Sequence, residues 1–498
     1  MVGIPRITPD NINLHDDKVW DSIQEDTTGI FQMESDMAKK YLNDILSETS
    51  FNKIKKKYPN ITKFDLYMFI NAAIRPAGEN FRNEATQGIC NETGIKHLDD
   101  MLYDTLGYTL LQEQIMQFLV DFCGYSNAES DNVRRAIGKK LGTDDLLPEI
   151  KDRFLKYTPN KYNIDINKAM EIIDPFLDTV KSASNYGFSK NHNVPYAITG
   201  VVAGHLRYYY PLEFLCASLN TWTRKKHMED IIRTTEYANK KGIKINNPKF
   251  RYSKSDYFID KKSNSIFKGV ESIKYLNKEV GEYLYSLRDR KYNSFIELLD
   301  DIKGVVNSRQ LDILIELDYF SEFGKSQKLM DIVELYNTIY TKKQFKKDSL
   351  PCDIEIMRKY AATETDKMFK DIDKQGICKY IESIIEDVDL PIQQRIKSWI
   401  ENTGSCNLID ETQPRKNAIV IDITTKYKTP KIKLYNFYSG KTAEVKIGAR
   451  LWREYKLELF DVITIVRTNS KFKKKRISDK WIETDEKEYW LEDYIICK

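Results

Sequence analysis

The chain has 498 residues, which at about 150 residues per domain predicts roughly three domains, each large enough for its own core. Hydrophobic residues make up 41% and charged residues 31%, a composition typical of a soluble globular protein that excludes a disordered or fibrous one. No apolar stretch reaches the ~18 residues of a membrane-spanning helix, and no secretory signal can be recognised. We therefore expect a cytoplasmic protein with no membrane partner.

The charges are unevenly distributed along the chain. The formal net charge of +4 is by itself too small to indicate a nucleic-acid partner. From Arg415 to Lys498, however, there are 20 Lys and Arg against 12 Asp and Glu, so the preceding residues sum to about −4. The basic excess is thus C-terminal. The seven cysteines form no CxxC pair, which disfavours a disulfide framework or a zinc site and predicts free, buried thiols.

The first 250 residues have the periodicity of helices. The segment 110–122 places five apolar side chains on one face, which predicts an amphipathic helix buried on that side: Leu111, Ile115, Phe118, Leu119 and Phe122. The segment 194–219 is apolar on nearly all sides and predicts a helix inside a large core. A polar, turn-rich segment over 246–265 predicts a domain boundary near residue 250.

The rest of the chain predicts helices followed by a barrel. Residues 251–340 have the pattern of paired short helices, and 341–414 form a charged helical connector with no recognisable chemistry. From residue 415 the period changes to two, with five strands and one helix, 449–459, after the third strand. This order is typical of an OB-fold, a partly open barrel that binds single strands or sugars. The predicted fold class is mainly α with a C-terminal all-β OB-like barrel.

The segment 124–140, GYSNAESDNVRRAIGKK, predicts a glycine turn followed by a cationic helix. Arg135 and Lys139 lie four residues apart and share a face, with Arg134 and Lys140 beside them. Such a surface suits a triphosphate or a nucleic-acid backbone, because arginine can bind two phosphate oxygens at once. A solvated basic helix face is the alternative, and spacing alone favours it.

Three further segments carry candidate residues. Lys190 and His192 follow a glycine turn and precede an apolar helix, where free amides favour an anion; His192 could instead be a hydrogen-bonded loop residue. Arg75 precedes a proline at a predicted helix end and could contact phosphate. The tripeptide 112–114, Gln-Glu-Gln, predicts structural hydrogen bonds.

Six blocks in this order resemble the bacterial DNA polymerase III alpha subunit, a C-family replicative DNA polymerase, from its fingers onward. They span about 190 residues and are TTGIFQMES, IRPAG, LGYTLLQEQIM, GYSNAESDNVRRAIGKK, YGFSKNHNVPYA and YYPLEF. The resemblance implies that residues 1–250 are a fingers domain that binds the incoming nucleotide and the templating duplex. It implies nucleotide contacts for Arg134, Arg135, Lys139, Lys190 and His192, and DNA contacts for Arg75 and Lys140.

The resemblance also implies DNA contacts in the later domains. Residues 251–340 are similar to a tandem helix-hairpin-helix region with Lys274 as a DNA contact, but the expected hairpin glycine is replaced by Tyr-Leu-Asn at 275–277. Asn277 would best tolerate the left-handed turn. In the OB domain, 415–498, Tyr435 and Trp452 are candidate stacking residues, together with Phe437 and Tyr438.

Two short motifs are weaker candidates. Residues 310–314, QLDIL, resemble the peptide with which replication proteins bind a sliding clamp, but their helical setting favours a core role. A sliding clamp is therefore only a further candidate partner. The pair Asp371 and Asp373 lies in the connector between lysines and predicts a solvated helix rather than a metal site.

The resemblance implies that the palm is absent from this chain, and with it the paired aspartates that hold two metal ions. We expect no catalytic residue and no metal ligand here, with Mg²⁺ bound only by the palm of a partner chain. The predicted function is the nucleotide- and DNA-binding half of a replicative DNA polymerase. Its partners would be primer-template duplex, single-stranded template, dNTP and a palm-bearing chain. The alternative is a non-catalytic DNA-binding accessory protein or a polymerase relic.

Overall fold

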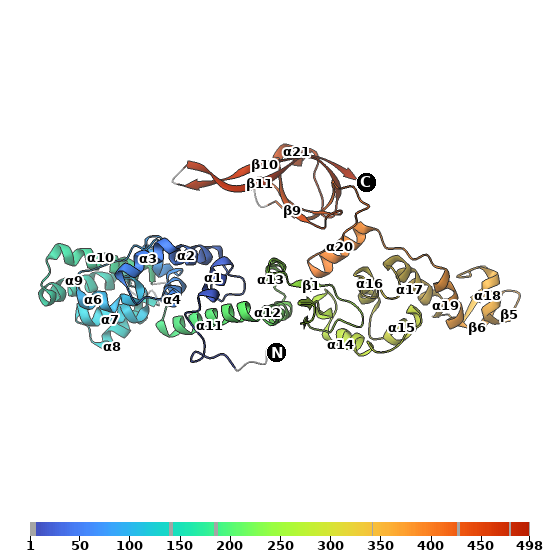
Figure 1. The fold of residues 1–498 in the computed structure, drawn as a ribbon, viewed down its shortest axis with the longest axis horizontal. Coiled ribbons are helices and arrows are strands. Elements are labelled where there is room, and N and C mark those ends of the chain that lie inside the picture. The colour runs from blue at the N-terminus through green and yellow to red at the C-terminus, as the bar shows by residue number, and fades with distance from the viewer. Residues whose placement is uncertain are drawn as a thin grey trace. The chain divides into compact units, whose positions relative to one another are not determined.

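The computed structural model describes residues 6–138, 143–183, 188–340, 342–425, 429–477 and 480–497. The chain forms two compact units, Met1–Ser218 and Leu219–Lys498, each described by itself (Figure 1). None of the described helices is both long and apolar enough to cross a membrane. All seven cysteines are free, and Cys123, Cys216 and Cys378 are buried.

The first unit is helical, and α12 (Pro211–Lys225) extends across its boundary. Its other helices are α1 (Asp17–Glu25), α2 (Asp36–Leu46), α3 (Glu48–Lys57), α4 (Lys63–Ala73), η1 (Pro76–Gly78), α5 (Arg82–Thr86), α6 (Lys96–Met101), η2 (Tyr103–Thr105), α7 (Gln112–Cys123), α8 (Asn127–Gly138), α9 (Thr143–Tyr162), α10 (Ile166–Ala183) and α11 (Lys190–Tyr209). The amphipathic helix predicted over 110–122 is confirmed as α7, which ends at Gly124 with φ +68°.

The prediction of a helix buried on all sides over 194–219 is wrong. Helix α11 ends at Tyr209, before Pro211, and only one of its faces is buried. That face carries small residues because neighbouring helices approach closely: a Cβ on Gly200 would lie 2.0 Å from the Tyr67 hydroxyl, and one on Gly204 2.6 Å from Ile23. The apolar residues on its other sides include Tyr196 and Tyr208, which are exposed.

The second unit begins with α13 (Met228–Lys240) and a small sheet in the order β1-β3-β2. Its strands are β1 (Lys244–Asn246), β2 (Phe258–Asp260) and β3 (Ser265–Phe267). The paired helices predicted before residue 340 follow, as η3 (Val270–Ser272), α14 (Lys278–Ser286), α15 (Phe295–Ile302), α16 (Ser308–Glu316) and α17 (Ser326–Tyr340). A continuous apolar core joins them, with Leu284, Phe295 and Leu314 fully buried.

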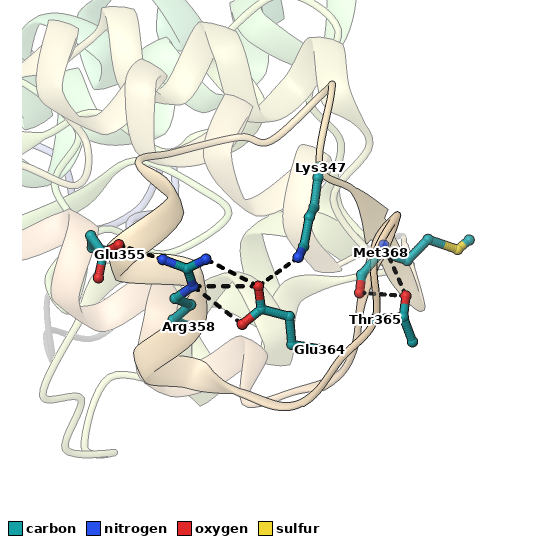
Figure 2. A network of polar contacts seen from close by, with 6 residues as sticks. All are labelled: Lys347, Glu355, Arg358, Glu364, Thr365 and Met368. Carbon is teal, nitrogen blue, oxygen red and sulfur yellow. Dashed lines mark hydrogen bonds and ion pairs between the residues drawn. The ribbon is translucent and has the colours of Figure 1, made fainter.

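The connector contains a sheet that the sequence pattern did not indicate. Between α17 and α20 (Ile392–Thr403) lie β4 (Gln344–Lys346), α18 (Ile354–Tyr360), β5 (Ala361–Glu364), β6 (Met368–Ile372) and α19 (Lys374–Ile384). The strands pair in the order β4-β6-β5. Glu364, at the end of β5, forms ion pairs with Lys347 Nζ at 2.6 Å and with Arg358 Nε at 3.2 Å (Figure 2). These two cations, Arg358 first, hold the pKa of Glu364 below its ordinary value.

The solvated helix predicted around Asp371 and Asp373 is also wrong. Asp371 lies in β6 with φ +51°, and its carboxylate accepts a hydrogen bond from Thr363 Oγ1 at 2.8 Å. Asp373 caps α19 by accepting from Gly376 N at 2.9 Å. Asp371 therefore links β6 to β5, and Asp373 stabilises the first turn of α19.

The predicted OB-like barrel is confirmed, and it is closed. Its five strands pair in the order β10-β11-β9-β8-β7, with β7 also bonded to β10. The elements are β7 (Asn417–Thr424), β8 (Lys431–Asn436), β9 (Thr442–Ile447), α21 (Ala449–Glu454), β10 (Val462–Ile477) and β11 (Lys480–Cys497). The single helix lies after the third strand, as predicted.

The last two strands extend well beyond the barrel as a long hairpin (Figure 1). The predicted strands stopped at residue 467 and resumed at 488, because the residues between them are polar and basic. Pairing across the hairpin explains the extension: Lys471 faces Glu488, and Phe472 faces Lys487. Such cross-strand pairs stabilise a ladder whose sequence has no regular apolar alternation. Strand β10 carries six Lys and Arg and no Asp or Glu, whereas β11 carries two Lys against six Asp and Glu, so the basic residues lie on one strand of the hairpin.

Candidate functional site

The starts of α7 and α11 lie together in the first unit. Leu111 and Phe188 form a short parallel bridge, and Gln112 N donates to Phe188 O at 3.0 Å. Glu113 then accepts from Ser189 Oγ at 2.5 Å and from Lys190 N at 2.9 Å, so its carboxylate meets the first free amides of α11. The structural role predicted for residues 112–114 is confirmed.

The arginines of α8 share one carboxylate on their own helix. Asp131 lies 2.8 Å from Arg134 Nη2 and 2.8 Å from Arg135 Nη2. The Arg134 hydrogen bond and the charge of Arg135 hold the pKa of Asp131 below its ordinary value. Arg134 Nη1 also donates to Gln112 Oε1 at 3.3 Å, which ties α8 to the start of α7. Lys139 and Lys140 lie outside the described residues.

The remaining predicted residues gather around Phe188. The Arg75 guanidinium lies 5.3 Å from the centre of the Phe188 ring and donates to Gln32 Oε1. Lys190, two residues after Phe188, pairs with Asp104 at 3.0 Å. His192 is exposed, with its ring 6.2 Å from that of Tyr196. We name Arg75, Arg134, Arg135, Lys190 and His192 the cationic cluster.

The cationic cluster has the chemistry of an anion site. Its residues come from the end of α4, from α8 and from the start of α11, and the contacts through Phe188 and Gln112 connect all three. Two of its cations are half or more exposed: Arg135 at 64% and Lys190 at 54%. A triphosphate could replace Asp131 and Asp104 as their partner, because charge-assisted bonds to phosphate are strong and surface ion pairs are weak.

The hairpin before α14 differs from the prediction in its turn residue. Tyr275, and not Asn277, adopts the left-handed conformation, with φ +69°. Asn277 is instead the N-cap of α14 and accepts from Val280 N at 3.0 Å. The Tyr275 ring is exposed and lies 3.4 Å from the Arg309 guanidinium and 5.2 Å from Lys274 Nζ.

The second hairpin, between α15 and α16, retains a glycine that the sequence pattern did not single out. Gly304 has φ +84° and open space where a Cβ would lie, so a phosphate could approach the backbone there. Gln310 Nε2, on α16, donates to Tyr275 O at 3.0 Å and so joins the two hairpins. Lys274, Tyr275, Gly304 and Arg309 are all exposed, and we name them the hairpin tips. In the sequence, the tripeptide Ile-Lys-Gly at 302–304 is the feature that could have indicated this glycine turn.

Tyr435 is not available for stacking on a base, so that prediction is wrong. It is fully buried between the barrel and α20, and its hydroxyl donates to Leu408 O at 2.5 Å. Phe437 is buried in the same cluster. Trp452 is half-buried against the barrel core, and Tyr438 is half-buried with Arg415 over its ring at 4.8 Å. Alternate side chains of a barrel strand point inward, and in a small barrel the inward-pointing aromatic rings are buried in the core.

The clamp-like peptide and a metal site find no support in the described part of the chain. Residues 310–314 belong to α16, and Leu311, Ile313 and Leu314 are buried, as their helical setting predicted. Among the described residues, no group of three or more His, Cys, Asp or Glu side chains is placed to hold a metal ion.

The first unit is helical with a local cationic cluster, and the second unit combines paired helical hairpins with an OB-like barrel, a fold that binds oligonucleotides or sugars in many proteins. The family model for the bacterial DNA polymerase III alpha subunit finger domain matches residues 3–54 and 77–160. The model for the helix-hairpin-helix motif matches residues 242–330. The chain is therefore similar to the finger domain of the bacterial DNA polymerase III alpha subunit and, further along, to a helix-hairpin-helix motif.

Three similar proteins are alpha subunits of DNA polymerase III. The DNA polymerase III subunit alpha of Ureaplasma parvum is 26% identical over 63% of this chain and 31% of that protein. The subunit of Halalkalibacterium halodurans is 26% identical over 65% of this chain and 27% of that protein. The subunit of Treponema pallidum is 28% identical over 54% of this chain and 23% of that protein. The chain matches less than a third of the length of these three relatives.

Proposed function

We propose that this chain is the nucleotide- and DNA-binding part of a replicative DNA polymerase, acting with palm carboxylates that come from outside the residues described here. The observation that carries the proposal is the cationic cluster, in which three segments with fingers-like sequence blocks meet around Phe188. The incoming dNTP would bind through its phosphates to Arg134, Arg135 and Lys190. Mg²⁺ would be held by the palm, and replication would place the protein in the cytoplasm.

In this proposal the DNA contacts belong to the hairpin tips and to the barrel. The hairpin tips offer two cations, an exposed aromatic ring and one open glycine turn, a combination suited to a phosphate backbone. The basic strand β10 and the half-buried Trp452 would contact single-stranded template. Lys139 and Lys140 directly follow α8 in the sequence and remain candidates for nucleotide and DNA contacts.

Nucleotide binding tests the proposal directly. We expect Arg134→Ala to weaken the binding of a fluorescent dNTP to the full chain at least tenfold, because it removes a guanidinium that can bind two phosphate oxygens. Lys151→Ala is the control: Lys151 forms an ion pair with Asp174 at 2.7 Å between α9 and α10, outside the cationic cluster. Equal dNTP affinity in the wild type and Arg134→Ala would contradict the proposed site.

A non-catalytic DNA-binding protein is the second candidate function. The observation that favours it is the pairing of the cluster cations with Asp131 and Asp104, which leaves them satisfied without nucleotide. Both functions predict DNA binding, so dNTP affinity separates them. Primer extension on addition of a palm polypeptide would exclude the second candidate, whereas DNA binding without any dNTP binding would favour it.

A further inference from the structure

A small cavity in the second unit lies between α13, β1 and the loop that follows α20. Its volume is about 190 Å³, and its lining is rich in hydrogen-bonding groups, with Asn239 on α13, Asn247 after β1, and Ser405 and Asn407 on the loop. Two lysines, Lys244 and Lys268, complete the polar lining. The described residues that line the cavity include no Asp or Glu.

Lys268 is the unusual member of this lining. It follows β3, is only 7% exposed, and donates from Nζ to Ser405 Oγ at 2.8 Å. The Trp399 ring lies 5.8 Å from the same ammonium. An ammonium has three donors, and within the described part of the chain Ser405 is its one hydrogen-bond acceptor. A buried cation without a carboxylate is costly, and burial lowers the pKa of Lys268 to about 8.

We propose that this cavity binds a small phosphate-type oxyanion, held by the ammonium of Lys268 and by the side-chain amides of the surrounding asparagines. An oxyanion would accept the Lys268 donors that the protein leaves without an acceptor and would neutralise the buried charge. Exposed Lys244, at the start of β1, adds a second positive charge to the same lining. The absence of a carboxylate from the described lining excludes a cation and favours an anion.

The size of the cavity and the type of its hydrogen-bond donors indicate which anion it binds. Lysine and amide N–H groups bind oxygen atoms, and the cavity is large enough for an orthophosphate and for little more than a pyrophosphate. Orthophosphate and pyrophosphate share this chemistry, and their affinities distinguish them. The inference is independent of the proposed polymerase role, because every lining residue lies between Thr235 and Asn407 and none belongs to the cationic cluster.

The experiment is a titration of the full chain with orthophosphate, pyrophosphate and chloride, monitored by calorimetry and by ³¹P NMR line width. We expect saturable binding of one or both phosphates and at least tenfold weaker binding of chloride. Lys268→Met should reduce the phosphate affinity at least tenfold, since it removes the buried ammonium while filling its space.

Two further variants keep the test conclusive if Lys268→Met folds differently. Asn407→Asp leaves Lys268 in place and adds a carboxylate to an exposed position of the lining, so it should also weaken phosphate at least tenfold. Lys262→Met, an exposed lysine between β2 and β3, removes the same charge outside the cavity and should leave the affinity unchanged. Phosphate binding that survives both cavity variants, or equal binding of chloride, would overturn the proposal.

Discussion

Arg207 is a fully buried cation on α11 that links this helix to α1 and to the loop that follows α1. Its Nη1 donates to Thr28 O at 2.7 Å, and its Nη2 donates to Ser22 O at 2.7 Å. Arg207→Met should lower the free energy of unfolding by about 3 kcal/mol, because two buried carbonyls lose charged donors. Arg207→Lys should recover only part of this loss, since a single ammonium cannot reproduce the planar pair of guanidinium nitrogens that reaches both carbonyls.

Urea unfolding of the full chain measures the Arg207 effect. The control is Arg153→Met on α9, whose guanidinium is 38% exposed and pairs with Glu149 at 3.1 Å. A surface ion pair of this kind contributes less than about 1 kcal/mol. If both variants cost the same, the buried carbonyl contacts of Arg207 contribute nothing beyond an ordinary surface charge.

Lys268 predicts a pH dependence of stability. Its pKa is about 8 in the folded protein and near 10.5 when unfolded, so unfolding takes up a proton between these pH values. The free energy of unfolding should therefore increase as the pH rises from about 8 to about 10.5. Below pH 8 the full cost of burying the charged ammonium remains. Lys268→Met should remove the rise and stabilise the protein at pH 7 by up to about 3 kcal/mol.

Denaturant unfolding of the wild type and Lys268→Met, at pH 7 and pH 10 without phosphate, checks this prediction. Lys244 and Cys406 are the other ionisable groups among the described cavity residues, and both are retained in Lys268→Met. The Cys406 thiol interacts electrostatically with Lys268, so its titration changes with the substitution, and the comparison is repeated in a Cys406→Ser background. A constant stability difference between pH 7 and pH 10 would contradict the lowered pKa.

For single residues, the sequence predicted which side chains belong to the candidate site better than it predicted which groups those side chains contact. Arg134, Lys190 and Arg75 were found because cations beside glycine and proline turns suggest anion binding, and the structure connects them through Phe188. The carboxylate partner of Lys190, Asp104, lies 86 positions before it, and no local pattern links the two. Tyr435 was misassigned for a similar reason, since burial in a small barrel depends on packing against α20.

At the scale of elements, the two hairpins differ in one turn residue. Gly304 adopts φ +84° with open space at its Cβ position, so Gly304→Ala adds strain but no clash. We expect a stability loss of about 1 kcal/mol from the left-handed backbone. We also expect several-fold weaker binding of duplex DNA, because the new methyl group would hold phosphate away from the turn.

Gly242→Ala is a closely matched control for the hairpin variant. Gly242, after α13, has φ +72° and likewise nothing within 4 Å of a Cβ, so its substitution carries similar strain outside the hairpins. Thermal unfolding and fluorescence anisotropy with duplex DNA measure the two effects separately. Weaker DNA binding in both variants would show that strain, and not the hairpin turn, is responsible.

Elements with a strong local period were predictable, and those made by long-range pairing were not. Helix α7 and the barrel strands follow their apolar periods, so their positions could be predicted. The connector strands β4, β5 and β6 span at most five residues each, and their pairing joins segments that a helix separates. The outer part of the β10–β11 hairpin has no apolar period, and cross-strand charge pairs stabilise it instead.

At the scale of the whole molecule, the net charge of +4 conceals a basic region placed on a single strand, β10, whose hairpin partner β11 is acidic. Five of six consecutive residues, 471–476, are Lys or Arg, and all lie on β10. Single-stranded DNA carries one charge per nucleotide, and cations that contact it release condensed counterions. Binding of the full chain to single strands should therefore weaken steeply with salt.

The salt dependence can be assigned to the hairpin with one substitution. Lys471 is exposed, with its ammonium 4.7 Å from the Trp490 ring, so a bound strand could contact both the charge and the aromatic face. Lys471→Glu should weaken single-strand binding and reduce the slope of log affinity against log salt by roughly 0.7 for each phosphate that the variant no longer neutralises. Lys367→Glu, in the exposed β5–β6 turn, changes the net charge equally and should leave the slope unaltered. Equal slopes for both variants would mean that binding responds to total charge and that the hairpin has no specific role.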